Sequence, residues 1–122
     1  MGLVMKWYRI NDARDCAVEC DWEEYAKWSQ KDRTLQIIAQ EDVGYVWVST
    51  VLLGIDHNFE EDGPPLIFET MVFAREGKDG NINYGELEME RYSTIQEARD
   101  GHKRMVDLCR DEYSLPIEEV SC

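Results

Sequence analysis

The run from Tyr45 to Ile55 constrains the fold of this chain more than any other segment. It is rich in β-branched and aromatic residues, namely Tyr45, Val46, Trp47, Val48, Thr50 and Val51. Such residues favour strands because their side chains pack well on a pleated surface. Both faces of the run are largely apolar, which predicts a strand at the heart of the core. The chain must therefore build a sheet around it.

Three further segments alternate polar and apolar residues with the period of two that is typical of strands. They are the segment around Leu35, Ile37 and Ala39, the segment from Leu66 to Ala74, and the segment from Tyr84 to Tyr92. Turns are predicted at Glu41 to Gly44 and at Gly77 to Gly80, and a loop at Asp56 to Pro65. Short connections between successive strands favour an antiparallel meander. In the last strand, we expect Leu87 and Met89 to face the core.

The N-terminal part of the chain predicts two short strands followed by a helix. Extended pieces on either side of a turn at Asn11 to Asp15 fit the first pattern. A helix is predicted from Trp22 to Gln30, because its apolar residues recur at helical spacing. Asp21 and Glu24 have the spacing of a capping box at its start.

A second helix is predicted to run to about Arg110, because apolar residues recur on one of its faces. Either Ser93 or Thr94 can open it through a capping box. His102 lies on the apolar face, where we expect a packed and hydrogen-bonded histidine. Together these segments predict a single α+β domain over residues 1–122. We expect an antiparallel sheet of three to five strands and two helices.

The charge of the chain restricts its partners. There are 26 acidic and 13 basic residues, so the formal net charge is −13. This charge repels nucleic acid and anionic membranes and favours basic partners, although it also simply keeps a small protein soluble. No stretch approaches the roughly 20 apolar residues that span a bilayer. The N-terminus lacks the apolar core of a signal peptide, so we expect a cytoplasmic protein.

Acidic residues gather in two segments that are candidates for a binding surface. They are Glu60, Glu61 and Asp62 in a loop, and Glu86, Glu88 and Glu90 in the last strand. Alternate residues of a strand lie about 7 Å apart, close to the spacing of phosphates along a nucleic-acid strand. The row therefore fits an imitation of nucleic acid. The alternative is a solvated strand face that discourages edge pairing.

A second candidate site combines Asp56 and His57, which follow the central run, with Glu69 and Arg91 on neighbouring strands. A carboxylate on an apolar strand face must be paired, hydrogen-bonded or protonated. Arg91 is the natural partner of Glu69, and an ion pair between the strands is the simplest interpretation. His57 is either a base in a small enzyme or an ordinary loop histidine.

The sequence contains no phosphate-binding glycine loop, nucleophile elbow or metalloprotease helix motif. Its four cysteines, Cys16, Cys20, Cys109 and Cys122, lack the spacing of a zinc finger. In a reducing compartment they are free thiols. We therefore expect no metal, no cofactor and no catalytic residue.

Several segments in a specific order carry a resemblance to a known family. They are the segments from Val48 to Phe59, Gly63 to Phe73, Glu90 to Thr94 and Glu97 to His102, preceded by Trp22 to Trp28. This pattern resembles a family of small uncharacterised proteins of tailed bacteriophages and prophages. The resemblance covers most of the chain, from about Asp21 to Val106. It implies a phage origin and expression in the cytoplasm of an infected bacterium, but it implies no catalytic residue.

Charge and resemblance together favour a non-enzymatic phage accessory protein that binds a host or phage protein. We expect a basic protein partner, with no direct contact to nucleic acid or membrane. The sharper hypothesis is an acidic inhibitor of a nucleic-acid-binding or defence protein. A small enzyme or ligand-binding protein that uses the region of Asp56, His57 and Glu69 stays open, as does a phage structural or assembly factor. The oligomeric state also stays open.

Overall fold

The computed structural model of the chain describes residues 6–58, 62–76 and 81–113. Its elements are β1 (Trp7–Ile10), β2 (Ala17–Cys20), α1 (Trp22–Lys31), the 3₁₀ turn η1 (Arg33–Gln36), β3 (Ile37–Val43), β4 (Val46–Leu52), β5 (Phe68–Glu76), β6 (Asn81–Tyr92) and α2 (Ile95–Tyr113). All the strand pairs described are antiparallel. The two helices and two sheets form the predicted α+β fold.

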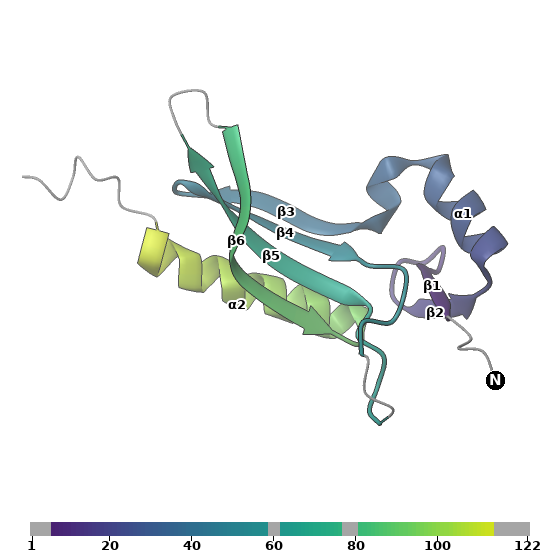
Figure 1. The fold of residues 1–122 in the computed structure, drawn as a ribbon. Helices are drawn as coiled ribbons and strands as arrows, with labels where there is room; N and C mark the ends of the chain where they lie inside the picture. Colours follow the sequence, from purple (N-terminus) through teal and green to yellow (C-terminus); the bar gives the residue numbers. More distant parts are fainter. Residues whose placement is uncertain (1–5, 59–61, 77–80, 114–122) are drawn as a thin grey trace, which may run out of the picture.

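Four strands form a meander in the order β3-β4-β5-β6 (Figure 1). The segment with the strongest strand pattern became β4, which lies between β3 and β5, and its Val46 and Val48 are fully buried. The predicted antiparallel pair of the last two strands is confirmed by the register of β5 and β6. The turn predicted at residues 77–80 lies outside the described residues.

Two predictions for the segment before β4 are wrong. Leu35 lies in η1 rather than in a strand, because Asp32 caps a short turn there by accepting a hydrogen bond from the Thr34 N–H at 2.8 Å. Residues 41–43 continue β3 instead of forming a turn. The hairpin closes through Gly44 and Tyr45 alone. Gly44 has a φ of 59°, a conformation that glycine adopts readily.

α2 lies along one face of the four-stranded sheet (Figure 1). One of the two predicted capping boxes forms: Thr94 Oγ1 accepts from the Glu97 N–H at 3.1 Å, and Glu97 Oε1 accepts from the Thr94 N–H at 3.2 Å. The apolar side of the helix packs on the sheet in a core of Val43, Val46, Val48, Val72, Met105, Val106 and Cys109. Neither described helix has both the length and the apolar composition needed to cross a bilayer.

The β1–β2 hairpin and α1 pack at one end of the sheet (Figure 1). Both predicted short strands and the predicted helix are confirmed, and Asp21 Oδ1 accepts from the Glu24 N–H at 2.8 Å. The unit is attached where the chain leaves β4, because the Tyr8 N–H donates to the Gly54 carbonyl at 2.7 Å. The Tyr25 ring covers Gly54, where a Cβ atom would come within 2.8 Å of it.

The predicted orientation of β6 is wrong. The register pairs Tyr92 with Phe68 and Glu88 with Val72, and these apolar partners belong to the buried cores. Leu87 and Met89 therefore point to the opposite face, with exposed fractions of 44% and 41%. The reason lies in the short link from β6 to α2, which brings Gly101 of the helix directly against the Tyr92 ring. This contact holds α2 on the Tyr92 side of the strand.

Candidate functional site

The main candidate site is the face of the four-stranded sheet opposite α2. The strand register places six apolar side chains on it: Trp47, Val51, Met71, Phe73, Leu87 and Met89. We call these six residues the open face. Within the described part of the chain, α2 lies over the opposite side and α1 lies beyond the end of the sheet (Figure 1). No described helix therefore covers the open face.

The open face has the residue types that protein interfaces use. The Trp47 and Phe73 rings lie beside each other on paired strands, with centroids 5.9 Å apart. Met71 pairs with Met89, and Leu87 and Met89 keep more than two-fifths of their surface in contact with water. Aromatic residues and methionine are enriched where proteins meet, because they bury much apolar area. Covering Leu87 and Met89 would contribute about 1 kcal/mol each.

An ion pair and a hydrogen bond connect the open face to β3. Arg75 of β5 pairs with Asp42 of β3, and Gln40 donates to Ser49 Oγ at 2.9 Å. Arg75 and Asp42 are partly exposed, so their ion pair adds little to stability. Both contacts place polar groups along the β3 side of the apolar residues, as the rim of a protein interface does.

The predicted pair of Glu69 and Arg91 is confirmed, with Arg91 Nε donating to Glu69 Oε2 at 2.8 Å. Glu69 shares its face with Met71 and Phe73, as predicted, but that face is the open face and not the core. Glu69 is only 7% exposed, since neighbouring side chains surround it. The carboxylate is thus neutralised by its cross-strand partner, which favours a structural role.

The predicted acidic row is divided in the structure. Glu88 and Glu90 lie opposite Val72 and Thr70, on the α2 side of β6, whereas the bulge at Leu87 places Glu86 opposite Phe73. Glu90 forms an ion pair with Arg104 of α2. In the loop, Asp62 is exposed, while Glu60 and Glu61 lie outside the described residues. The regular 7 Å spacing needed to imitate phosphates therefore holds for Glu88 and Glu90 only.

The Asp56 and His57 pair serves the loop that contains it. Asp56 Oδ1 accepts from the Asn58 N–H at 2.7 Å and from the Leu66 N–H at 2.8 Å. His57 Nδ1 lies 3.0 Å from the Ile55 carbonyl oxygen. Leu66 precedes Glu69 by three residues, about 10 Å along an extended chain. The loop pair and the Glu69–Arg91 pair thus belong to different segments.

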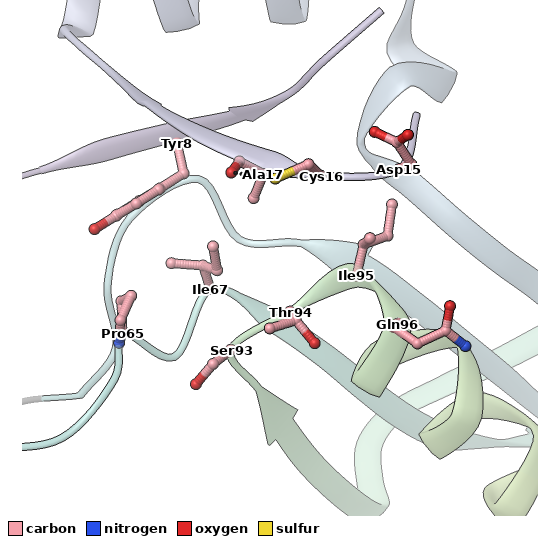
Figure 2. Close-up of a pocket in the computed structure, with 10 residues that line it drawn as sticks. All are labelled: Tyr8, Asp15, Cys16, Ala17, Pro65, Ile67, Ser93, Thr94, Ile95 and Gln96. Atoms are coloured by element: carbon pink, nitrogen blue, oxygen red, sulfur yellow. Dashed lines mark hydrogen bonds between the residues drawn. The ribbon is translucent and has the colours of Figure 1, made fainter. Parts of the chain in front are cut away.

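A pocket of about 370 Å³ lies between the β1–β2 turn, the chain before β5 and the start of α2 (Figure 2). Its lining is Tyr8, Asp15, Cys16, Ala17, Pro65, Ile67, Ser93, Thr94, Ile95 and Gln96. Asp15 is the single charged residue among them. Burial, with a further contribution from Glu19, raises the pKa of Tyr8. No sequence pattern indicates this pocket, because three segments that are distant in the chain form it. It lacks the convergent polar groups of an active site.

A chain of hydrogen bonds runs beneath α2 between the two cores. His102 Nε2 lies 2.8 Å from Glu41 Oε1, and His102 Nδ1 lies 2.7 Å from Thr50 Oγ1. Thr50 Oγ1 also lies 2.5 Å from Thr70 Oγ1. Thr70 Oγ1 in turn accepts a hydrogen bond from the Tyr92 hydroxyl at 3.0 Å. The order carboxylate, imidazole, hydroxyl is that of a catalytic triad. However, Thr50 is fully buried, which favours a structural role for the network.

The hydrogen-bonded environment predicted for His102 is thereby confirmed, but its partner Glu41 was missed because that residue was assigned to a turn. Among the residues that the structure describes, no group of three His, Cys, Asp or Glu side chains is placed to hold a metal ion. Comparison with family models, with curated proteins and with solved structures finds no match. The function is therefore argued from the surface of the molecule.

Proposed function

We propose that this chain is a non-enzymatic binding protein that recognises another protein through its open face. The observation that carries the proposal is the exposed pair Leu87 and Met89 beside Trp47 and Phe73, on a sheet face that no described helix covers. Contiguous exposed apolar side chains with a polar rim are typical of interaction surfaces. Small proteins gain solubility from burying such residues, so their exposure points to a partner.

The charge of the chain favours a basic protein as that partner. Two copies would each bring a net charge of −13, so association with a second copy works against mutual repulsion. A basic partner gains attraction at the rim and covers the apolar strip at the centre. The resemblance to phage proteins makes a nucleic-acid-binding or defence protein of the host a natural target. The site of action is then the cytoplasm of an infected bacterium.

The two alternatives have weaker support. An enzyme that uses Asp56 and His57 conflicts with the hydrogen bonds that tie Asp56 to its own loop. A phage structural or assembly factor would use the same open face, but its partner would be a virion protein. Recovery of the chain with purified virions distinguishes this assembly role from binding to a host protein.

Paired variants with matched exposure test the proposal. The tagged chain and the variants Leu87→Ser and Met89→Ser are used to capture proteins from infected cells, and captured proteins are then rebound in purified form. Leu108→Ser is the control, because Leu108 is also 41% exposed but lies on α2. We expect each open-face variant to weaken binding of the purified partner about fivefold or more, and the control to leave it unchanged.

The proposal is wrong if all three variants bind the purified partner equally. Light scattering on the same samples measures the oligomeric state and so tests whether a second copy of the chain covers the open face. A dimer that Leu87→Ser converts to a monomer, with no change for Leu108→Ser, would identify the open face as a self-association surface instead.

A further inference from the structure

The outer edge of β6 is the second feature of the surface that a partner can use. β6 is the last strand of the sheet and pairs with β5 on one side. Within the described residues no strand pairs with its other side. A strand in this position presents backbone groups that can accept a further strand, and natural proteins protect such edges. Here the protection is partial.

Bulges limit where the edge is regular. The register of β5 and β6 runs through five consecutive pairs, from Phe68↔Tyr92 to Val72↔Glu88, before it shifts at Leu87 and again beyond Glu86. Bulges bend a strand and interrupt its ladder. Residues 88–92 are therefore the straight part of the edge, long enough for a short added strand.

We propose that the partner adds an extended segment, with alternating basic and apolar residues, along residues 88–92 of β6. This inference rests on the proposed function and names the partner's binding mode. On the α2 side, residues 88–92 present Glu88 and Glu90; on the other side, they present Met89 and Arg91, which is paired with Glu69. An added strand must place its own alternate side chains beside these two sets.

The chemistry of each side then fixes the partner's sequence pattern. Beside Glu88 and Glu90, lysine or arginine forms cross-strand ion pairs. Glu90 also forms an ion pair with Arg104 of α2. Beside Met89, an apolar residue extends the open face by one strand. Backbone hydrogen bonds provide affinity and the alternating side chains provide specificity, as in other cases of strand addition.

The glutamates on this edge also disfavour the addition of β6 from a second copy of this chain. Two β6 strands that pair antiparallel would bring Glu88 and Glu90 of one copy beside those of the other. Like charges directly opposite each other on neighbouring strands are destabilising. The edge therefore discriminates between itself and a basic segment.

Short synthetic peptides test this inference on the full chain. The first peptide alternates lysine and valine, the second has the same composition in two blocks, and the third is the first with N-methyl groups on alternate backbone nitrogens. Binding is followed by ¹H–¹⁵N spectra and by amide hydrogen exchange. We expect the first peptide to shift the amide signals of residues 88–92 and to protect those N–H groups that point away from β5. The peptide with lysine and valine in two separate blocks and the N-methylated peptide should each bind roughly tenfold more weakly than the first peptide.

A charge reversal gives the matched control. Glu88→Lys should weaken binding of the alternating peptide, whereas Asp107→Lys, a charge reversal at an exposed position of α2, should leave it unchanged. Equal binding of all three peptides, or no binding, overturns the inference. In that case the proposed function still stands if Leu87→Ser weakens partner binding about fivefold or more. The proposed function itself is wrong if the open-face variants bind the purified partner as well as the unchanged chain does.

Discussion

At the scale of single residues, one contact decides which face of the sheet is left open. Gly101 of α2 lies so close to the Tyr92 ring that an added Cβ would come within 2.2 Å of it. The ring also donates its hydroxyl to Thr70 at 3.0 Å in the buried network. Tyr92 is thus held from two sides, and it fixes α2 against the sheet.

The substitution Gly101→Ala should destabilise the fold. Alanine favours a helix over glycine by about 1 kcal/mol, but overpacking against Tyr92 costs about 1–3 kcal/mol. We expect a net loss in the free energy of unfolding, measured by urea denaturation. Lys103→Ala, at an exposed position of the same helix, is the control and should leave stability within about 0.5 kcal/mol. Increased stability of Gly101→Ala would contradict the close contact.

The cysteine thiols should differ in reactivity because their environments differ. Burial raises the pKa of Cys109 to about 11, and the charges of Glu112 and Glu88 add to this. About one thiol in a thousand is then ionised at pH 8, and only the thiolate reacts readily. We expect iodoacetamide to modify exposed Cys16 in the folded protein well before Cys109, as measured by peptide mass spectrometry. Rapid modification of Cys109 would show that its burial is wrong.

The raised pKa of Cys109 also determines how the free energy of unfolding changes with pH. Because the pKa of Cys109 is raised in the folded state, its contribution to the free energy of unfolding is present below the ordinary pKa of 9.0. It is lost as the pH rises through about 11. Comparison with Cys109→Ala isolates this loss from that of other groups.

At the scale of elements, the N-terminal hairpin and α1 are attached to the sheet through Gly54. This glycine has a φ of 89° and lies under the Tyr25 ring, while its carbonyl accepts from the Tyr8 N–H. The bridge between Trp7 and Ile55 is a further backbone contact between this unit and the chain that follows β4. The unit should therefore respond to changes at Gly54 more than the sheet does.

The substitution Gly54→Ala should loosen this attachment. The positive φ and the approach to Tyr25 together cost about 1–3 kcal/mol. We expect changes in ¹H–¹⁵N shifts to concentrate in β1, β2 and α1, while β5 and β6 keep theirs. In a Tyr25→Leu background the same change should cost less, since the ring is gone. Equal costs in both backgrounds would mean that only the backbone angle matters.

The sequence predicted the elements better than their faces. Helical period and caps located α1 and α2, and alternation located β5 and β6, because these signals are local. Alternation in β6 shows that its two sides differ, but it does not show which side a helix will cover. The contact of Gly101 with Tyr92 decides that, and it joins residues on two different elements. Leu87 and Met89 were assigned to the core for this reason.

The candidate site was predictable only in part. The Glu69–Arg91 pair follows from two neighbouring strands and was found from the sequence. The open face combines β4, β5 and β6, so it needs both the strand register and the position of α2. The register shift at Leu87 also separates Glu86 from Glu88. Bulges of this kind have no reliable sequence signal, and the predicted row of three was wrong as a result.

At the scale of the whole molecule, the net charge of −13 opposes the compact state, because folding brings like charges together. Added salt screens this repulsion, with a Debye length of about 8 Å at physiological ionic strength. We therefore expect Tm to rise as sodium chloride is added from low concentration, as followed by calorimetry. An equal rise with potassium chloride distinguishes screening from binding of a specific ion. A Tm that falls or stays constant would contradict this expectation.

The one-sided cover of the sheet separates two tasks along the same strands. Val46, Val48, Phe68 and Val72 point towards α2 or the adjoining core, while their neighbours Trp47 and Met71 point to the open face. Substitutions at alternate positions can therefore change recognition while the packing that determines the fold is kept. The binding specificity of this scaffold can therefore diverge independently of its core. This holds for a lineage whose targets change and for a laboratory library that is randomised at the open-face positions alone.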